Sequence, residues 1–377
     1  LPNYTEFKNL YEESEGEEYP KKSFDLADTI PSVWKDTLYE FVSEAVIPQP
    51  LAEVEYSCID NDLDRWIYIA SSGVLYYDKQ KNSYAKKEQL NNLYRRDPRL
   101  EGLATTHLQR NNIAHVDSQT FRPGSEFIFE EKGSRYLNKY RDPRFEKITS
   151  NVEYDISIWR NHLKILANQD ETNLKTLEDI IASDLKHPEQ NRTFAVILNS
   201  SQGVGKTVFF NGLQILYGKS NCSDLNMKQL TGQYQPHMLD SCYLFVNEID
   251  SSGIDDKGRR ANLKTIISDE HHTVELKGVD LMKVNCHYTV WGATNETIPL
   301  YMAKGERRTF YLEVEATKQQ IESDNPNYFK EFTDFTSSYD RMREVYDFYR
   351  YRYQVSKGFD RHHAPTTLAK EELIESS

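Results

Sequence analysis

A run of small residues that ends in a lysine and a threonine is the part of this sequence best suited to chemistry. The run follows the apolar stretch Phe194–Leu198, and apolar residues at helical spacing come after it. Small residues let backbone N–H groups curl around a phosphate, and the N-terminus of a helix adds positive potential there. This order of strand, loop and helix predicts a phosphate-binding loop. The expected loop residues are Ser200, Ser201, Gln202, Gly203, Val204, Gly205, Lys206 and Thr207.

Two side chains of this loop suit a nucleoside triphosphate and its magnesium ion. Lys206 is expected to reach the β- and γ-phosphates, and the Thr207 hydroxyl is expected to ligate Mg²⁺. Ser200 stands where the usual pattern has its first glycine, and serine is small enough to be tolerated there. ATP and Mg²⁺ are therefore the expected cofactors.

A second apolar run, Tyr243–Val246, ends in a polar and acidic turn. Carboxylates at the C-terminal end of a buried strand beside a phosphate loop hold the metal and orient the attacking water. We predict that Glu248 is the catalytic carboxylate and also a Mg²⁺ ligand. Asp250 is the alternative base, in which case Glu248 would turn toward the metal. Asn247 stands where many such motors carry a second acid, and its amide cannot act as a base.

Two further groups complete the predicted chemistry. Asn295 follows the apolar run Tyr288–Ala293, where a polar amide beside the γ-phosphate would position the attacking water. Arg307 and Arg308 stand at the start of another apolar run. Arginine near a transferring phosphoryl group stabilises the charge of the transition state, and in ring ATPases it reaches the nucleotide of the neighbouring subunit.

These groups can act together only if their strands belong to one sheet. Apolar strands and helical patterns alternate through this part of the chain, which predicts an α/β fold with a central, mainly parallel sheet. We expect a P-loop NTPase domain at residues 191–318. A mixed α+β accessory domain at 1–150 and a small collar-like helical unit at 151–190 would precede it, and a helical segment with a tail at 319–377 would follow.

Helical periodicity predicts helices both before and after the motor domain. Two amphipathic helices are expected before it, and His187-Pro188 should end the second because proline disfavours helix at the preceding residue. Their apolar faces consist of Ile156, Trp159, Leu163 and Leu166, and of Leu174, Leu177, Ile181 and Leu185. A third helix is expected over Asp340–Val355, with tyrosines as its packing face. The acidic tail from Leu368 is expected to be frayed.

Bulk properties narrow the class of protein. The 377 residues carry a net charge of −13, which counts against a protein that coats duplex DNA but allows a narrow channel with a few basic groups. None of the four cysteines forms a CxxC pair, so a zinc site is not expected. No apolar run is long enough for a membrane span and no signal peptide opens the chain, which favours a cytoplasmic location. The chain begins at Leu1 rather than methionine, and we therefore expect a fragment.

Taken together, the motifs resemble those of the superfamily 3 helicases, which are AAA+-like, and most closely the phage and mobile-element primase-helicases. The compact series consists of Ser200–Thr207, Tyr243–Glu248, Tyr288–Asn295 and Arg307-Arg308. The resemblance extends over residues 120 to 315. It implies an ATP-dependent DNA helicase for replication that moves 3′→5′ along single-stranded or forked DNA. It also implies a hexameric ring, a primase-polymerase domain on the N-terminal side and, for a viral protein, the host-cell cytoplasm.

The same family places a β-hairpin with a basic tip between the second and third motifs. Residues 274–284 read as strand, turn and strand, and Lys277-Gly278 resembles the Lys-Gly step of the family. The resemblance therefore implies that Lys277 contacts DNA. His272 and Lys283 are weaker candidates for the same role, as is His271.

Two other functions are compatible with these motifs. One is a different P-loop DNA-dependent ATPase, such as a loader or a packaging motor. The other is a replication-initiator binding protein whose P-loop is inactive. The short spacing between the motifs and the hairpin favour the helicase over the first, and the intact ATPase motifs argue against the second.

Overall fold

The computed structural model describes most of the chain after residue 58. The described residues are 59–72, 75–95, 97, 100, 103–143, 145–149, 153–232, 239–249, 264–269, 271–276, 279–285, 287–295 and 307–376. They fall into two compact units. Among the described residues, one unit contains those at 59–66 and 78–113, and the other contains those at 67–77 and 114–376.

The first unit holds a small helical assembly. Its elements are a 3₁₀ helix at Ile59–Arg65, β3 at Ser83–Lys86, α3 at Lys87–Leu93 and α4 at Ala104–Arg110. The Arg65 guanidinium donates to both carboxylate oxygens of Asp78, at 2.9 and 2.6 Å. The indole of Trp66 donates to the Tyr94 hydroxyl at 2.8 Å. These polar contacts satisfy side chains that are almost completely buried.

The second unit begins with short strands. They are β1 at Trp66–Ile69, β2 at Leu75–Asp78, β4 at Ala114–Val116, β5 at Ser118–Thr120, β6 at Ile128–Glu131 and β7 at Ser134–Asn138. Strand β1 pairs in parallel with β4, and β7 pairs in parallel with β5 and antiparallel with β6. No catalytic group was predicted in this region.

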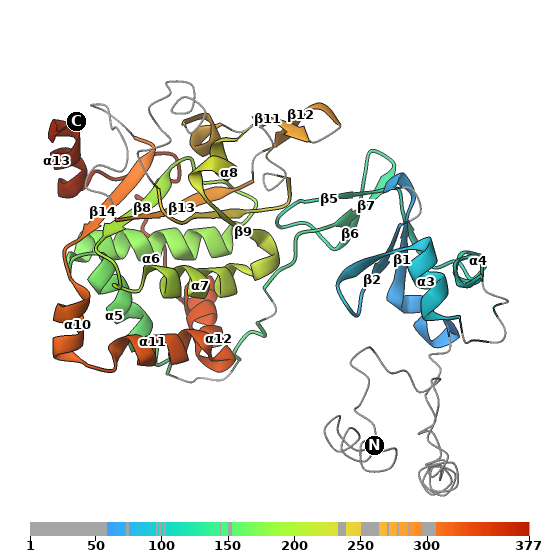
Figure 1. Cartoon of the computed structure of the whole chain (residues 1–377), viewed down its shortest axis with the longest axis horizontal. Helices are drawn as coiled ribbons and strands as arrows, with labels where there is room; N and C mark the ends of the chain where they lie inside the picture. The colour runs from blue at the N-terminus through green and yellow to red at the C-terminus, as the bar shows by residue number, and fades with distance from the viewer. Residues whose placement is uncertain are drawn as a thin grey trace, which may run out of the picture. The chain divides into compact units, whose positions relative to one another are not determined.

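A five-stranded parallel sheet forms the centre of the second unit (Figure 1). Its strands are β8 at Ala195–Ser200, β9 at Cys222–Leu225, β10 at Tyr243–Val246, β13 at Thr289–Thr294 and β14 at Thr309–Val314. The order across the sheet is β14-β8-β13-β10-β9, and every neighbouring pair is parallel. This confirms the predicted α/β class with a parallel sheet.

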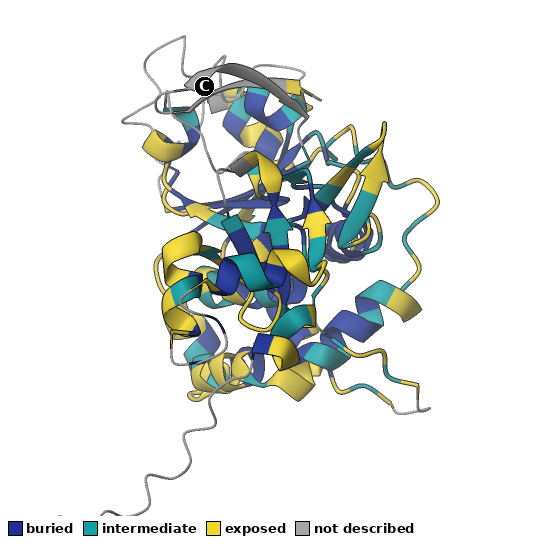
Figure 2. Ribbon diagram, turned by 90° about the vertical axis from the view of Figure 1, so that its right-hand side faces the viewer, coloured by how far each residue is buried: buried dark blue, intermediate teal, exposed yellow. Residues whose placement is uncertain are grey.

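Both faces of this sheet are covered, which explains why its strands are apolar throughout. Alternate residues of β8, such as Val196 and Ile197, enter two separate cores. The larger core faces α5 at Ser157–Leu166, α6 at Glu171–Lys186, α7 at Lys206–Tyr217, α11 at Tyr328–Ser337 and α12 at Tyr339–Asp347. The smaller core faces α8 at Met227–Thr231 and α13 at Leu368–Ser376. Dark bands of buried residues run through this sheet and its helices in Figure 2.

The two helices predicted ahead of the motor are confirmed. Trp159, Leu163 and Leu166 of α5 are completely buried, as the helical pattern predicted. Helix α6 ends at Lys186, one residue before the His187-Pro188 step. Among the described helices, none combines the length and the apolar character that crossing a membrane requires.

The predicted helix over Asp340–Val355 is wrong at its C-terminal end. Helix α12 stops at Asp347 and continues only as a π-helical turn, Phe348–Arg352. The wider turn lets the fully buried Tyr349 donate to Glu178 at 3.1 Å, while Tyr353 after the turn donates to Asp179 at 3.0 Å. Aromatic packing against α6 therefore overrides helical periodicity here. The tyrosines do form a packing face, as predicted.

The tail also differs from the frayed end that was predicted. It forms α13, which contacts β14. Lys370 is buried, and its ammonium donates to the Thr309 carbonyl at 2.8 Å. Leu373 enters the smaller core. The composition of the tail could not predict this helix, because its average acidic charge gives no sign that Lys370 and Leu373 are buried. Helix α10, which precedes α11 in the chain, spans Lys318–Asp324.

One buried ionic cluster provides a test of this packing. Asp184 is fully buried between Arg192 at 3.5 Å and Arg361 at 3.2 Å. Asp184→Ala would leave two guanidinium groups buried without their carboxylate, so we expect the free energy of unfolding to fall by about 3–5 kcal/mol. Urea unfolding followed by circular dichroism measures this change.

The matched control is Glu344→Ala on α12. Its partner Arg341 lies 3.4 Å away, and that side chain is 44% exposed. Exposed pairs contribute about 0–1 kcal/mol, so the control should change stability little. Equal losses in the two variants would contradict the burial of the Asp184 cluster.

Candidate functional site

The order of the strands brings the predicted motifs to one edge of the sheet. Strand β13 lies between β8 and β10, and all three point the same way. Their C-terminal ends therefore meet, which is where open parallel sheets bind ligands. Two hydrogen bonds join the turns: the Ile249 amide donates to the Ala293 carbonyl at 2.8 Å, and the Thr294 hydroxyl donates to the Ile249 carbonyl at 2.7 Å.

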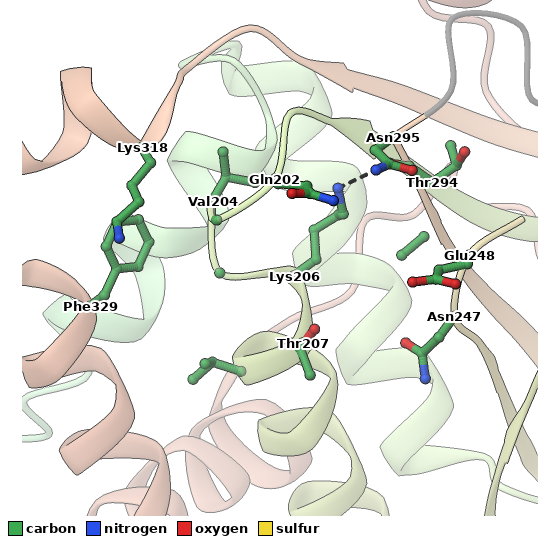
Figure 3. A pocket seen from close by; sticks show the side chains of 14 residues that line it. Gln202, Val204, Lys206, Thr207, Asn247, Glu248, Thr294, Asn295, Lys318 and Phe329 are labelled. Carbon is green, nitrogen blue, oxygen red and sulfur yellow. Dashed lines mark hydrogen bonds between the residues drawn. The ribbon is translucent and has the colours of Figure 1, made fainter.

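A pocket of about 430 Å³ lies at this edge (Figure 3). It brings together residues of the predicted loop, the acidic turn and Asn295. Its lining comprises Gln202, Gly203, Val204, Gly205, Lys206, Thr207, Val208, Asn247, Glu248, Ala293, Thr294, Asn295, Lys318 and Phe329. Of the predicted loop, Ser200 and Ser201 are not among the lining residues. The pocket therefore unites groups from Gln202 to Phe329, which are far apart in the sequence.

Lys206 is held at the centre of this edge by oxygen acceptors. Its ammonium donates to the Ser200 carbonyl at 3.0 Å, to the Ser200 hydroxyl at 2.5 Å and to the Thr294 carbonyl at 3.0 Å. Burial lowers the pKa of this ammonium to about 8. The serine in place of the usual first glycine thus acquires a contact that the sequence did not predict: it orients the lysine.

The shape of the loop requires glycine at two positions. Gly203 and Gly205 have φ values of +85° and +90°, a region that side chains with a Cβ rarely adopt. A Cβ on Gly205 would also lie 2.7 Å from Cε1 of His162, a fully buried ring of α5. Both backbone strain and lack of space therefore exclude larger residues at Gly205. Helix α7 begins directly after it, so its N-terminus faces the pocket.

Glu248 has an unusual backbone in the acidic turn. Its φ is +58°, although it is not a glycine. The flanking amides keep it there, because Asn247 donates to the Leu225 carbonyl at 3.1 Å and Ile249 donates to Ala293. Strained residues that the surrounding structure maintains cluster at functional sites. Asp250, the alternative base, lies outside the described residues, so the choice between the two carboxylates stays open.

Two side chains at this edge could act as ligands for Mg²⁺. Thr207 and Glu248 line the same pocket and offer a hydroxyl and a carboxylate, the hard oxygen ligands that Mg²⁺ prefers. Within the described ranges, no group of three or more His, Cys, Asp or Glu side chains is placed to hold a metal ion.

The two predicted arginines do not line this pocket. Arg307 and Arg308 directly precede β14, at the N-terminal edge of the parallel sheet, and the Arg308 carbonyl accepts from the Ala195 amide at the start of β8. The six residues of β14 span about 20 Å, which separates the arginines from the loop edge. Arg307 is exposed, and its guanidinium lies 3.3 Å from Nε2 of His363.

The predicted hairpin is present as backbone. Strand β11 at His271–Leu276 pairs antiparallel with β12 at Val279–Asn285. The turn residues Lys277 and Gly278 lie outside the described residues, as do the side chains of His272 and Lys283. Their contacts with DNA remain predictions.

Three residues near the loop were missed by the sequence motifs. His162 packs beneath Gly205, and its ring stacks on Phe332 with centroids 4.0 Å apart. Lys318 and Phe329 line the pocket from α10 and α11. All three come from helices outside the motif-bearing strands, and no local pattern in the sequence marks them.

A family model described as a family of unknown function (DUF5906) matches residues 198–308, the stretch that runs from the loop to the arginines. No match is found among the curated proteins.

Solved structures share the fold. "The apo structure of NrS-1 C terminal region (305-718)" aligns with a TM-score of 0.65 at 17% identity, covering 86% of this chain and 75% of that chain. The A form apo structure of the NrS-1 C terminal region aligns with a TM-score of 0.63 at 18% identity, covering 82% and 71%. At this level of identity the similarity is one of fold.

The lowered pKa of Lys206 predicts how the free energy of unfolding depends on pH. The lowered value means that the unfolded chain binds more protons than the folded chain between pH 8 and 10.5. The free energy of unfolding should therefore rise with pH across this window. Lys206→Met lacks the titrating group, so the wild type should gain stability relative to this variant as the pH rises.

Urea unfolding of both proteins without nucleotide, at pH values from about 7 to 10, measures this difference. Parallel pH profiles for the wild type and Lys206→Met would contradict the buried position of the ammonium.

Proposed function

We propose that this chain is the ATP-hydrolysing motor of a ring-forming DNA helicase that acts in replication. The observation that carries the proposal is one pocket lined by Lys206, Thr207, Glu248 and Asn295. Together these groups supply a cation for phosphate, oxygen ligands for Mg²⁺, a carboxylate and an amide. The order of their strands supports an AAA+-like P-loop NTPase.

Each group would have a separate role in hydrolysis. The loop amides and Lys206 would bind the β- and γ-phosphates, with Lys206 exchanging its present carbonyl acceptors for phosphate oxygens. Glu248 would accept a proton from the attacking water, which Asn295 would hold in line. The oxygen of that water bonds to the γ-phosphorus, and the bond to the bridging oxygen breaks so that ADP leaves with the electron pair. Bound Mg²⁺, held through Thr207 and Glu248, would neutralise charge on the phosphates.

The position of the arginines supports action between subunits. Arg307 and Arg308 lie at the edge of the sheet opposite to the pocket, too far to reach the nucleotide of their own chain. In a ring, each pair would reach the nucleotide of a neighbour. The hairpin with Lys277, His272 and Lys283 would then line a channel for single-stranded or forked DNA. The hexamer, the 3′→5′ direction and an N-terminal primase-polymerase partner belong to the same proposal.

Phosphate release and strand separation test the activity. The wild type should hydrolyse Mg·ATP and separate a forked duplex only when ATP is present. Lys206→Ala should abolish both reactions. Glu248→Gln should retain ATP binding and lower turnover by about 10²–10⁴-fold, since it removes a general base. Lys219→Ala, an exposed lysine beyond α7, is the matched control and should behave as the wild type.

The alternatives give different results. ATP hydrolysis without strand separation would point to a loader or packaging motor. No turnover in the wild type with single-stranded DNA present would point to an initiator with an inactive loop. Full turnover in Glu248→Gln would move the role of base to Asp250.

Mixing two inactive variants tests the arginines. Arg307→Ala and Arg308→Ala should each lose turnover while binding ATP nearly as the wild type does. Lys206→Ala has intact arginines and a defective loop. In a mixed ring, its arginines would face the intact loop of the arginine variant, so turnover should reappear on mixing. Mixed assemblies that form but stay inactive would contradict action between subunits.

A further inference from the structure

The pocket at the loop edge has two chemically different ends. Glu248, Asn247 and Asn295 lie on one side of Lys206, and Lys318 and Phe329 lie on the other (Figure 3). The first end carries the groups that the proposed hydrolysis uses. The second end combines an aromatic ring with a long aliphatic side chain, and the proposed hydrolysis uses neither.

Both residues of the second end lie directly against the glycines of the loop. A Cβ on Gly203 would lie 3.0 Å from Cδ of Lys318, and one on Gly205 would lie 3.4 Å from Cε1 of Phe329. The methylenes of Lys318 therefore cover one turn of the loop and the ring of Phe329 borders the next. The Lys318 ammonium lies 3.6 Å from Glu322, in a pair whose side chains are 54% and 37% exposed.

Neighbouring side chains of α11 and α5 fix the position of Phe329. Phe329 and its neighbour Tyr328 form an edge-on pair with centroids 5.3 Å apart. The Tyr328 hydroxyl lies 3.1 Å from Nδ1 of His162, which is itself stacked on Phe332. Burial lowers the pKa of the His162 imidazole to about 3, so this ring is a neutral part of the packing. The first turn of α11 is thus fixed next to the loop.

Phe329 is not an ordinary core residue. Phe332 and Phe335 on the same helix are 0% and 6% exposed and belong to the larger core. Phe329 is only half-buried, and its remaining surface faces the pocket. An aromatic surface left open beside a phosphate loop offers a platform for another flat ring.

The direction in which a nucleotide would lie in the pocket indicates which flat ring would stack on Phe329. The γ-phosphate must lie near Lys206 and the carboxylate side, because the attacking water has to reach it there. The ribose and base would then extend away from Glu248, past the loop, toward the side of the pocket where Figure 3 shows Lys318 and Phe329. We propose that Phe329 and the aliphatic part of Lys318 form the nucleobase subsite, in which the base of the nucleoside triphosphate stacks on Phe329. This inference rests on the proposed nucleotide-binding function.

The test compares two ligands that share phosphates but differ in the base. ATP and inorganic tripolyphosphate, each with Mg²⁺, are titrated into the full chain by calorimetry. Phe329→Leu keeps an apolar side chain of similar bulk but removes the aromatic face, so it should weaken ATP binding about tenfold. Tripolyphosphate binding should stay as in the wild type. Phe329→Trp should restore ATP binding, because it restores a flat ring.

The matched control is Tyr339→Leu, which removes an aromatic side chain that is 56% exposed on α12 and does not line the pocket. It should leave both affinities unchanged. Equal weakening of both ligands by Phe329→Leu would overturn the subsite, since the ring would then only support the loop. Unchanged ATP affinity would overturn it as well.

The result also separates this inference from the proposed function. A wild type that binds neither ligand would overturn nucleotide binding itself, and the subsite with it. A wild type that binds both, together with a Phe329→Leu variant that does the same with equal affinity, would overturn the subsite alone.

Discussion

In the five-stranded sheet, β13 lies between β8 and β10, and the three strands run in the same direction. Parallel strands end at a common edge, so whatever follows each strand must gather there. The loop follows β8, the acidic turn follows β10 and Asn295 follows β13. Without this order, Lys206 and Glu248 would not line the same pocket. Parallel pairing needs both faces of the sheet buried, and the helices on either side provide that cover.

At the loop edge, the surrounding fold maintains several locally unfavourable features. The Lys206 ammonium is partly desolvated, Glu248 has a positive φ and two loop glycines have conformations that other residues resist. The backbone amides of the acidic turn donate to the carbonyls of Leu225 and Ala293, which holds the turn in place. The loop follows β8, a strand whose residues are all buried. A binding anion would relieve the desolvated cation, because phosphate oxygens are better partners than neutral carbonyls.

The helical layer does more than cover the sheet. Helix α5 brings His162 against Gly205, and α11 brings Phe329 to the same glycine. The ends of the strands supply the side of the pocket with Lys206 and Glu248, and α10 and α11 supply the side with Lys318 and Phe329. The layer joins segments from before and after the motif-bearing strands, and so the pocket depends on residues from 162 to 329. The arginines precede β14 at the opposite edge of the sheet and belong to a different surface.

Local chemistry in the sequence was sufficient to predict four of the five strands of the parallel sheet, all except β9, and the two helices α5 and α6. It also selected the loop, Glu248 and Asn295, which line one pocket. Apolar periodicity and the small residues of the loop report directly on backbone conformation, and these features need no distant partner. The sequence could not reveal the contact between His162 and Gly205, the role of Ser200 toward Lys206, or Lys318 and Phe329 in the pocket. It also misjudged the end of α12 and the tail that becomes α13. Those features depend on which elements meet across the fold, and only tertiary packing sets the distances between them.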